Sequence, residues 1–118
     1  MKPLIAAALL AALAVPPAAA DVSRSKLEPA FTSTIVSTYP DGRTAKLWLN
    51  ADGTYKGVGR RRLPSSGVWT LKGEKVCLKQ KKPRAAPFAF CTPVPNGKTW
   101  SARAVTGEKI RVSLVPGR

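Results

Sequence analysis

The chain has 118 residues, of which 20 are lysine or arginine, 6 are aspartate or glutamate and none is histidine, for a net charge of +14 at pH 7. This length corresponds to one domain, which excludes multidomain enzymes. Without histidine, Ser-His and Cys-His nucleophile pairs and most zinc sites cannot form. Most of the few carboxylates belong to predicted turns, so a carboxylate pair for hydrolysis is also lacking. We therefore expect a protein that is not an enzyme and that needs no cofactor or metal.

Residues 1–20 predict a secretory signal peptide. One lysine near the start precedes an apolar run from Leu4 to Val15 and a small-residue segment that ends at Ala20. This layout predicts cleavage after Ala20 and a periplasmic or secreted protein. The apolar run is shorter than the roughly 20 residues of a membrane span. Removing these 20 residues, and with them the charge of Lys2, takes the chain from 118 to 98 residues and its net charge from +14 to +13.

The mature chain is predicted to be an extended N-terminal arm, 21–30, followed by a β-barrel-like domain, 31–118. After Asp21 no segment shows a sustained helical period, while short runs rich in Thr, Val, Leu and aromatic residues alternate with Gly, Pro, Asn and Asp. Evenly spaced runs of this kind are typical of sandwiches and barrels. The predicted strands are 31–39, 43–50, 54–60, 67–72, 75–81, 88–94, 98–105 and 109–115.

Turn residues predict which side chains share a face of the sheet. Pro40-Asp41-Gly42 suits a three-residue hairpin loop with glycine in the left-handed position, which sets Ile35 opposite Leu47. Ala51-Asp52-Gly53 has the same form and places Tyr55 on the same side as Leu47. The later turns predict Trp69 opposite Leu78 across Gly73-Glu74, Phe90 opposite Ala102 across Pro95-Asn96-Gly97, and Ala104 opposite Ile110 across Thr106-Gly107-Glu108. Each register brings apolar groups together, and this agreement strengthens the assignment.

The predicted inner face is apolar and aromatic. It consists of Phe31, Ile35, Tyr39, Leu47, Leu49, Tyr55, Trp69, Leu71, Val76, Leu78, Phe88, Phe90, Trp100, Ile110, Val112 and Leu114. The predicted fold class is all-β, a single up-and-down meander of about eight strands that forms a small barrel or clamshell with one disulfide. We expect side chains to fill the interior. A cavity near Gly57 and Gly59, which would also face inward, is the alternative.

Cys77 and Cys91 are predicted to form that disulfide, because an even cysteine count in a small secreted domain usually indicates a bridge. Closing a loop of about 15 residues would contribute about 3 kcal/mol to stability in the chain-entropy model. A redox role for two free thiols would require a closer pair in a thioredoxin-like alternation of strands and helices, and this sequence has neither.

Two resemblances follow from these motifs. Asp52-Gly53-Thr54-Tyr55, Gly67-Val68-Trp69, Cys77-Leu78 and Cys91 resemble the "DGTY…GxW…CL…C" pattern of small secreted bacterial β-rich proteins that are uncharacterised. That resemblance covers about residues 31–115 and implies a fold. The second half, through Trp100, looks like the periplasmic inhibitors of secreted bacterial metalloproteases. Those are eight-stranded barrels with one disulfide that insert an N-terminal segment into the protease, which would implicate Leu27, Glu28 and Pro29 here.

The outer face carries an aromatic residue among cations. The predicted register places Trp48 between Thr34 and Lys56, where it can make a cation–π contact or stack on a base or sugar. Arginine suits bidentate contact with phosphate or carboxylate, and lysine adds a point charge. The candidate ligand-binding residues are Lys46, Trp48, Lys56, Arg60, Arg61 and Arg62.

Three functions remain open at this stage. A net charge of +13 on 98 residues opposes compaction, which an acidic partner would offset. The first hypothesis is therefore a non-catalytic binding module for an anionic surface, an anionic polymer or an acidic protein. Nucleic acid is less favoured because no motif for it is present. One alternative is an inhibitor of a secreted or periplasmic hydrolase, which would insert either the N-terminal arm near Leu27, Glu28 and Pro29 or a hairpin loop. The other is a carrier of a small ligand inside the barrel. For any single basic cluster, simple solubility and protection of sheet edges is the competing explanation. The sequence leaves the oligomeric state open.

Overall fold

The computed structural model describes residues 18–84 and 89–118. Its elements are α1 (Ala18–Leu27), the 3-10 helix η2 (Glu28–Thr32), β1 (Ser33–Thr38), β2 (Thr44–Leu49), β3 (Thr54–Val58), β4 (Pro64–Lys72), β5 (Lys75–Lys82), β6 (Ala89–Pro93), β7 (Thr99–Arg103) and β8 (Lys109–Pro116). Most of the expected signal peptide, and Phe88 of the expected inner face, lie outside the described residues. Within them, no helix combines the length and apolar character that a membrane span requires.

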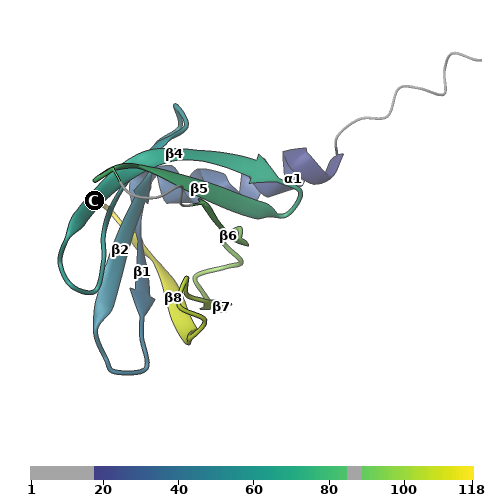
Figure 1. Ribbon diagram of the computed structural model, residues 1–118. Coiled ribbons are helices and arrows are strands. Elements are labelled where there is room, and N and C mark those ends of the chain that lie inside the picture. The colour runs from purple at the N-terminus through teal and green to yellow at the C-terminus, as the bar shows by residue number, and fades with distance from the viewer. Residues whose placement is uncertain (1–17, 85–88) are drawn as a thin grey trace, which may run out of the picture.

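The eight strands form one antiparallel sheet that curls into a nearly closed barrel (Figure 1). Its order is β6-β5-β4-β3-β2-β1-β8-β7, so the predicted all-β meander is confirmed. β1 pairs with β8 from Ser33↔Pro116 to Thr38↔Arg111, so the first and last strands of the chain lie side by side within the sheet. The opening lies instead between β6 and β7, which are consecutive in the chain.

The register predictions are confirmed at most turns. Ile35 pairs with Leu47, Tyr55 with Leu49, and Leu78 with both Trp69 and Phe90. The predicted pairing of Phe90 with Ala102 is wrong, because β6 and β7 do not pair in the described structure. Prolines at positions 93 and 95 bracket this connection and have no N–H to donate to a ladder, while the intervening Val94 N–H donates to Glu74 O at 3.1 Å.

The β7–β8 hairpin is shifted by two residues from the predicted register. Its loop is Val105-Thr106-Gly107, with Gly107 at a φ of 92° and the Ala104 N–H donating to Glu108 O at 2.8 Å. Ile110 therefore pairs with Ala102, and the predicted pairing with Ala104 is wrong. Since side chains alternate with a period of two, this shift leaves every residue on its predicted face.

A fourth hairpin loop has the same hydrogen bonds but no glycine. It spans Arg60-Arg61-Arg62, where Gly59 N–H donates to Leu63 O and Arg62 N–H donates to Gly59 O. Arg62 occupies the left-handed position, with a φ of 65°. The loop makes β4 begin at Pro64, three residues before the predicted start, and the missing glycine is why the sequence did not reveal it.

We expect Arg62→Gly to stabilise the protein by about 0.5 to 1 kcal/mol. A left-handed conformation costs a non-glycine residue about 1 to 2 kcal/mol, and the extra chain entropy of glycine in the unfolded state offsets part of that gain. Arg61→Gly is the matched control, because it removes the same charge at a position without positive φ and should destabilise. Urea denaturation of both variants tests this, and equal shifts in the two midpoints would contradict it.

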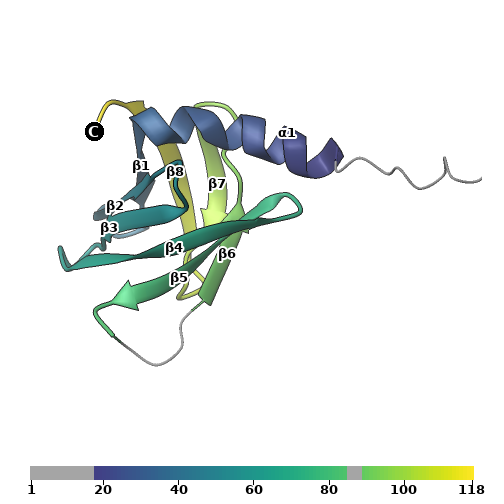
Figure 2. The same cartoon turned by 90° about the horizontal axis from the view of Figure 1, so that it is seen from above.

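The N-terminal segment is helical, so the predicted extended arm is wrong. Figure 2 shows α1 running across one end of the strands. Ser23, Leu27 and Ala30 are buried against the barrel, and Ser23 Oγ donates to Gly73 O at 2.9 Å. These positions form one helical stripe of i, i+4 and i+7. Because Leu27 is its only large apolar member, the stripe gave no recognisable period in the sequence.

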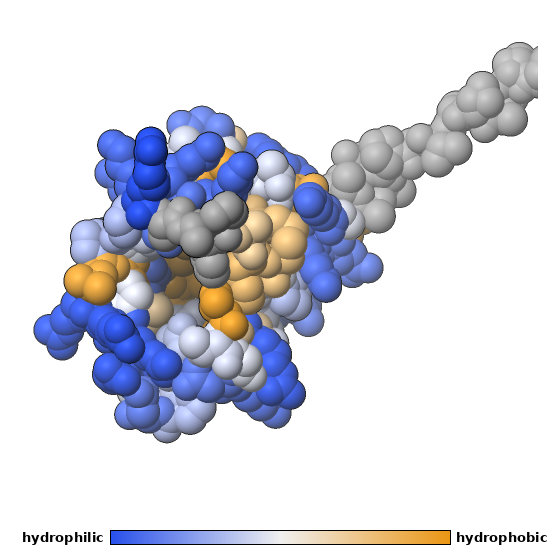
Figure 3. Space-filling model, in the orientation of Figure 1, coloured by the Kyte–Doolittle hydropathy of each residue, from blue (hydrophilic) through white to orange (hydrophobic). Residues whose placement is uncertain are grey.

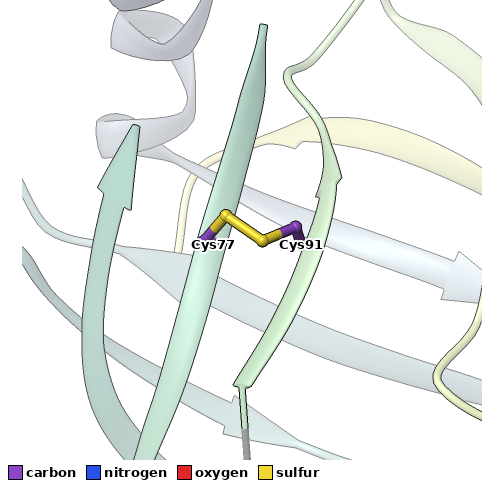
Figure 4. Close-up of a disulfide and its surroundings, with 2 residues drawn as sticks. All are labelled: Cys77 and Cys91. Atoms are coloured by element: carbon purple, nitrogen blue, oxygen red, sulfur yellow. A yellow bond between two sulfur atoms is a disulfide. The ribbon is translucent and has the colours of Figure 1, made fainter. Parts of the chain in front are cut away.

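The disulfide between Cys77 and Cys91 is confirmed. It joins directly paired residues of β5 and β6, whose Cα atoms are 3.9 Å apart (Figure 4). β6 has one paired neighbour in the sheet, so the bridge fastens an edge strand to the barrel. Both cysteines face outward, on the opposite side of the sheet from the neighbouring Leu78 and Phe90.

Side chains fill most of the interior, as expected. Nearly all predicted inner-face residues belong to the core cluster or pack against it, and Leu27, Ala30, Val94, Ala102 and Ala104 join them. A cavity of about 80 Å³ remains beside Phe90 and Trp100, well below the roughly 300 Å³ of typical ligand sites. Neither Gly57 nor Gly59 lines it.

Candidate functional site

The candidate site lies on the outer face of β2, β3 and β4, around Trp48. Trp48 pairs with Lys56 on β3, and its indole Nε1–H donates to Thr34 Oγ1 on β1 at 2.9 Å. The three residues thus lie side by side on the outer face, as the sequence predicted. Because Thr34 takes the single donor of the indole, the half-buried ring has only its apolar surface to offer to a ligand.

An apolar hollow of about 690 Å³ opens on one side of Trp48. Val58, Leu63, Pro64 and Pro83 contribute its apolar lining. Leu63 has 66% of its surface exposed. Figure 3 shows hydrophilic residues around the rim of one face and hydrophobic residues around a hollow near its centre. A hollow of this volume is within the range of small-molecule sites.

A second, cationic hollow of about 340 Å³ opens on the other side of Trp48. It is lined by Trp48, Asn50, Lys56 and Arg118. The Arg118 guanidinium donates to Asn50 Oδ1 at 2.8 Å, to Ala30 O at 3.1 Å and to the carbonyl of Leu49. These contacts hold the cation in place, and no aspartate or glutamate side chain among the described residues lines either hollow.

A chain of hydrogen bonds connects Trp48 to the C-terminal segment. Thr34 Oγ1, which accepts from Trp48, donates to Gly117 O at 2.8 Å, and the Gly117 N–H donates to Thr32 O at 3.0 Å. The residues that fix the ring therefore also fix the backbone that carries Arg118. The two sides of the candidate site are positioned by one network.

The structure brings only part of the predicted set together. Trp48 and Lys56 line both hollows, and Lys46 lies one row away, where it pairs with Val58. Arg61 and Arg62 are exposed in the loop that precedes Leu63. They are close in sequence to the apolar hollow but do not line it.

Arg60 does not join the Trp48 site. It lies at the end of the barrel, where its guanidinium is 3.0 Å from Glu108, 3.8 Å from Asp41 and 4.2 Å from the centre of the Tyr39 ring. The hydrogen bond to Glu108 raises the pKa of Arg60. Both carboxyl groups in turn have lowered pKa values. The positive charge of Arg60 is therefore already paired.

The pKa values of Asp41 and Glu108 are lowered mainly by hydrogen bonds from nearby residues. The backbone N–H of Arg43 is the largest contribution to the lowered pKa of Asp41, and the Thr106 hydroxyl is the largest for Glu108. Each carboxylate thus accepts hydrogen bonds from its own hairpin loop as well as a charge contact from Arg60. This arrangement joins three loops at one end of the barrel and uses two of the six acidic residues of the chain.

Sequence reasoning missed several residues that line the site. The predicted strands leave Leu63 and Pro64 in a loop, because the hairpin loop that ends at Arg62 has no glycine to indicate a turn. Pro83 and Arg118 reach the site through the β4–β5 pairing and the C-terminal segment, which tertiary structure alone reveals. An exposed leucine directly after three arginines was the one available signal for the apolar side.

The described residues hold no group of three potential metal ligands. Leu27, the first residue of the segment that an inhibitor would insert into a protease, is fully buried against the barrel, whereas Glu28 and Pro29 are exposed. Comparisons with protein-family models, curated proteins and solved structures found no match for this chain. The geometry around Trp48 is therefore the main indication of function.

Proposed function

We propose that the protein is a non-catalytic binding module, secreted or periplasmic, that associates with anionic molecules through the outer face around Trp48. One observation carries the proposal: Lys56 and Arg118 flank an anchored tryptophan beside hollows that no described aspartate or glutamate side chain lines. Tryptophan beside cations favours ligands that combine an apolar or planar part with negative charge.

The charge distribution supports this site. Asp41 and Glu108 are engaged by the arginines and the loops at one end of the barrel. Lys56, Lys82 and Arg118 line the two hollows without an acidic partner in that lining. An anion at this face would therefore meet cations that no described aspartate or glutamate side chain pairs, and its binding would relieve part of their mutual repulsion.

The form of the inhibitor hypothesis that inserts the N-terminal arm gains no support from the geometry. Insertion of the segment around Leu27 into a protease would require this fully buried side chain to leave the barrel. Leu27 is in contact with the core cluster, so its withdrawal would cost about as much as other losses of a buried leucine, roughly 2 to 5 kcal/mol. We therefore keep the binding module as the proposal.

A salt-dependent titration tests the proposal. We expect tryptophan fluorescence to report binding of dextran sulfate and of anionic glycolipid at low salt. The affinity should fall about tenfold or more when the salt concentration rises about fourfold, because released counterions oppose binding. Lys56→Gln should weaken binding at least about threefold, whereas Lys109→Gln, which removes an exposed lysine outside both hollows, should not.

Trp48→Ala shows which tryptophan carries the signal. It should abolish most of the fluorescence change, because Trp69 is buried in the core and Trp100 lines the interior cavity. A lack of binding by the wild-type protein to either anion at low salt would refute the proposed function.

A further inference from the structure

The two hollows beside Trp48 differ in character and meet at the same two residues. Trp48 and Lys56 line both, with aliphatic residues and prolines on one side and Arg118 with Asn50 on the other. We infer that the site takes a single-chain anionic amphiphile, with its hydrocarbon chain in the apolar hollow and its phosphate or carboxylate headgroup in the cationic one. This inference rests on the proposed function and specifies the class of ligand.

The apolar hollow has the features that a hydrocarbon chain requires. Its volume of about 690 Å³ is bounded by Val58, Leu63, Pro64 and Pro83. The Trp48 N–H is already bonded to Thr34, so a chain lying on the ring leaves no donor unsatisfied. The lysines at its border can line the hollow with their methylene stems while their ammonium groups reach water.

The cationic hollow has the features that a headgroup requires. Lys56 and Arg118 supply two positive charges, and the Arg118 guanidinium is oriented by its bonds to Asn50 and to two carbonyls. The Asn50 side chain is held by Thr54 Oγ1, which accepts from its Nδ2, and by Arg118, which donates to its Oδ1. Its second N–H can add a hydrogen bond to the two positive charges that would recognise the headgroup.

The distribution of exposed apolar residues favours one amphiphile over a bilayer surface. The exposed large hydrophobic residues of the described chain are Val22, Leu63, Val105 and Val115, which lie on four different elements or loops. Leu63 alone borders the site. Proteins that insert into membranes present a continuous apolar face, which this arrangement does not provide.

Calorimetric titration with alkyl phosphates tests the inference. Dodecyl phosphate, kept below its micellar concentration, should bind to the full folded protein. Affinity should fall by up to about fourfold for each methylene removed, because that is the effect of one fully buried CH₂. We expect butyl phosphate and the uncharged dodecyl maltoside each to bind at least about tenfold more weakly. Butyl phosphate lacks the long hydrocarbon chain, and dodecyl maltoside lacks the negative charge.

Two matched variants locate the hydrocarbon chain. Leu63→Asp should weaken dodecyl phosphate binding at least about tenfold, because it places a negative charge in the apolar hollow. Val105→Asp makes the same charge change at a valine that is 55% exposed and lines neither hollow, so it should leave the affinity within about twofold. Both side chains are exposed, and both variants should fold.

A spectroscopic readout places the ligand beside Trp48. The indole Nε1–H resonance of Trp48, assigned by its loss in Trp48→Phe, should shift on addition of dodecyl phosphate in the wild type and in Val105→Asp. At the same ligand concentration, the shift should be much smaller in Leu63→Asp, because that variant binds at least about tenfold more weakly. A shift of equal size in Leu63→Asp would overturn the inference.

The outcomes separate this inference from the proposed function. If butyl phosphate or dextran sulfate binds as tightly as dodecyl phosphate and Leu63→Asp has no effect, the amphiphile is refuted while anion binding stands. Equal binding of dodecyl maltoside, or binding to anionic vesicles but not to dodecyl phosphate, would also refute the amphiphile. If no anion binds at low salt, both proposals fail.

Discussion

Gly67→Ala is expected to destabilise the protein by about 3 kcal/mol or more. A Cβ at this position of β4 would lie 2.0 Å from Lys79 O and 2.8 Å from a ring carbon of Tyr55. The first neighbour is backbone, so it can move only if the β4–β5 ladder shifts. The register of that ladder is already irregular here, with Ser66 paired to Lys82 and Gly67 to Gln80. The alanine would therefore disturb both the sheet and the core.

Gly59→Ala is the matched control for that prediction. No atom lies within 4 Å of a Cβ at Gly59, and its φ is not positive, so the same change should alter stability by less than about 1 kcal/mol. Urea denaturation followed by circular dichroism measures both variants. Should Gly67→Ala unfold at the wild-type midpoint, the close approach of Lys79 to β4 would be wrong.

Leu27→Ala is expected to cost about 2 to 5 kcal/mol, the usual range for a buried leucine. Leu27 is 0% exposed and connects the N-terminal helix to the barrel core. Small domains have about 5 to 15 kcal/mol of total stability, so the loss is a large share of it. The Arg24 guanidinium, which lies 5.3 Å from the Phe31 ring and 5.4 Å from the Trp69 ring, would also lose its support if the helix detached.

Val22→Ala makes a similar truncation on the same helix, where 54% of the residue is exposed, and should cost less than about 0.5 kcal/mol. Thermal and urea unfolding of the two variants would compare them directly. Equal stability of Leu27→Ala and Val22→Ala would show that the helix is not part of the folded core.

Much of the fold was predictable because turn chemistry and binary pattern agree. Gly42 and Gly53 occupy left-handed positions in loops of the predicted length, and the registers beyond them followed. The failures have local causes. Arg62 adopts a glycine-like conformation, and the helix buries a single large side chain on its stripe. Neither feature leaves a pattern in the residue types.

Only those residues of the candidate site whose positions are set by strand pairing could be predicted from the sequence. Strand alternation placed Trp48 beside Lys56 and Thr34, because cross-strand neighbours are set by register. Arg118 and Pro83 come from segments whose positions depend on how the whole barrel closes. Arg60 does not belong to the site, although the sequence predicted it there, because it forms a salt bridge with Glu108, which is distant in sequence.

The β1–β8 pairing affects the order in which the strands of this sheet can assemble. Every strand pair except β1–β8 joins neighbours in the chain, so six of the seven ladders can form as local hairpins. The β1–β8 ladder joins segments at opposite ends of the sequence, and its loop-closure entropy must be paid before its contacts form. The edge of β1 that faces β8 therefore stays unpaired until the last strand is available, and we expect β1–β8 pairing to be a late folding step. Until then β1 presents an unpaired edge, which is the kind of surface that promotes aggregation of nascent chains.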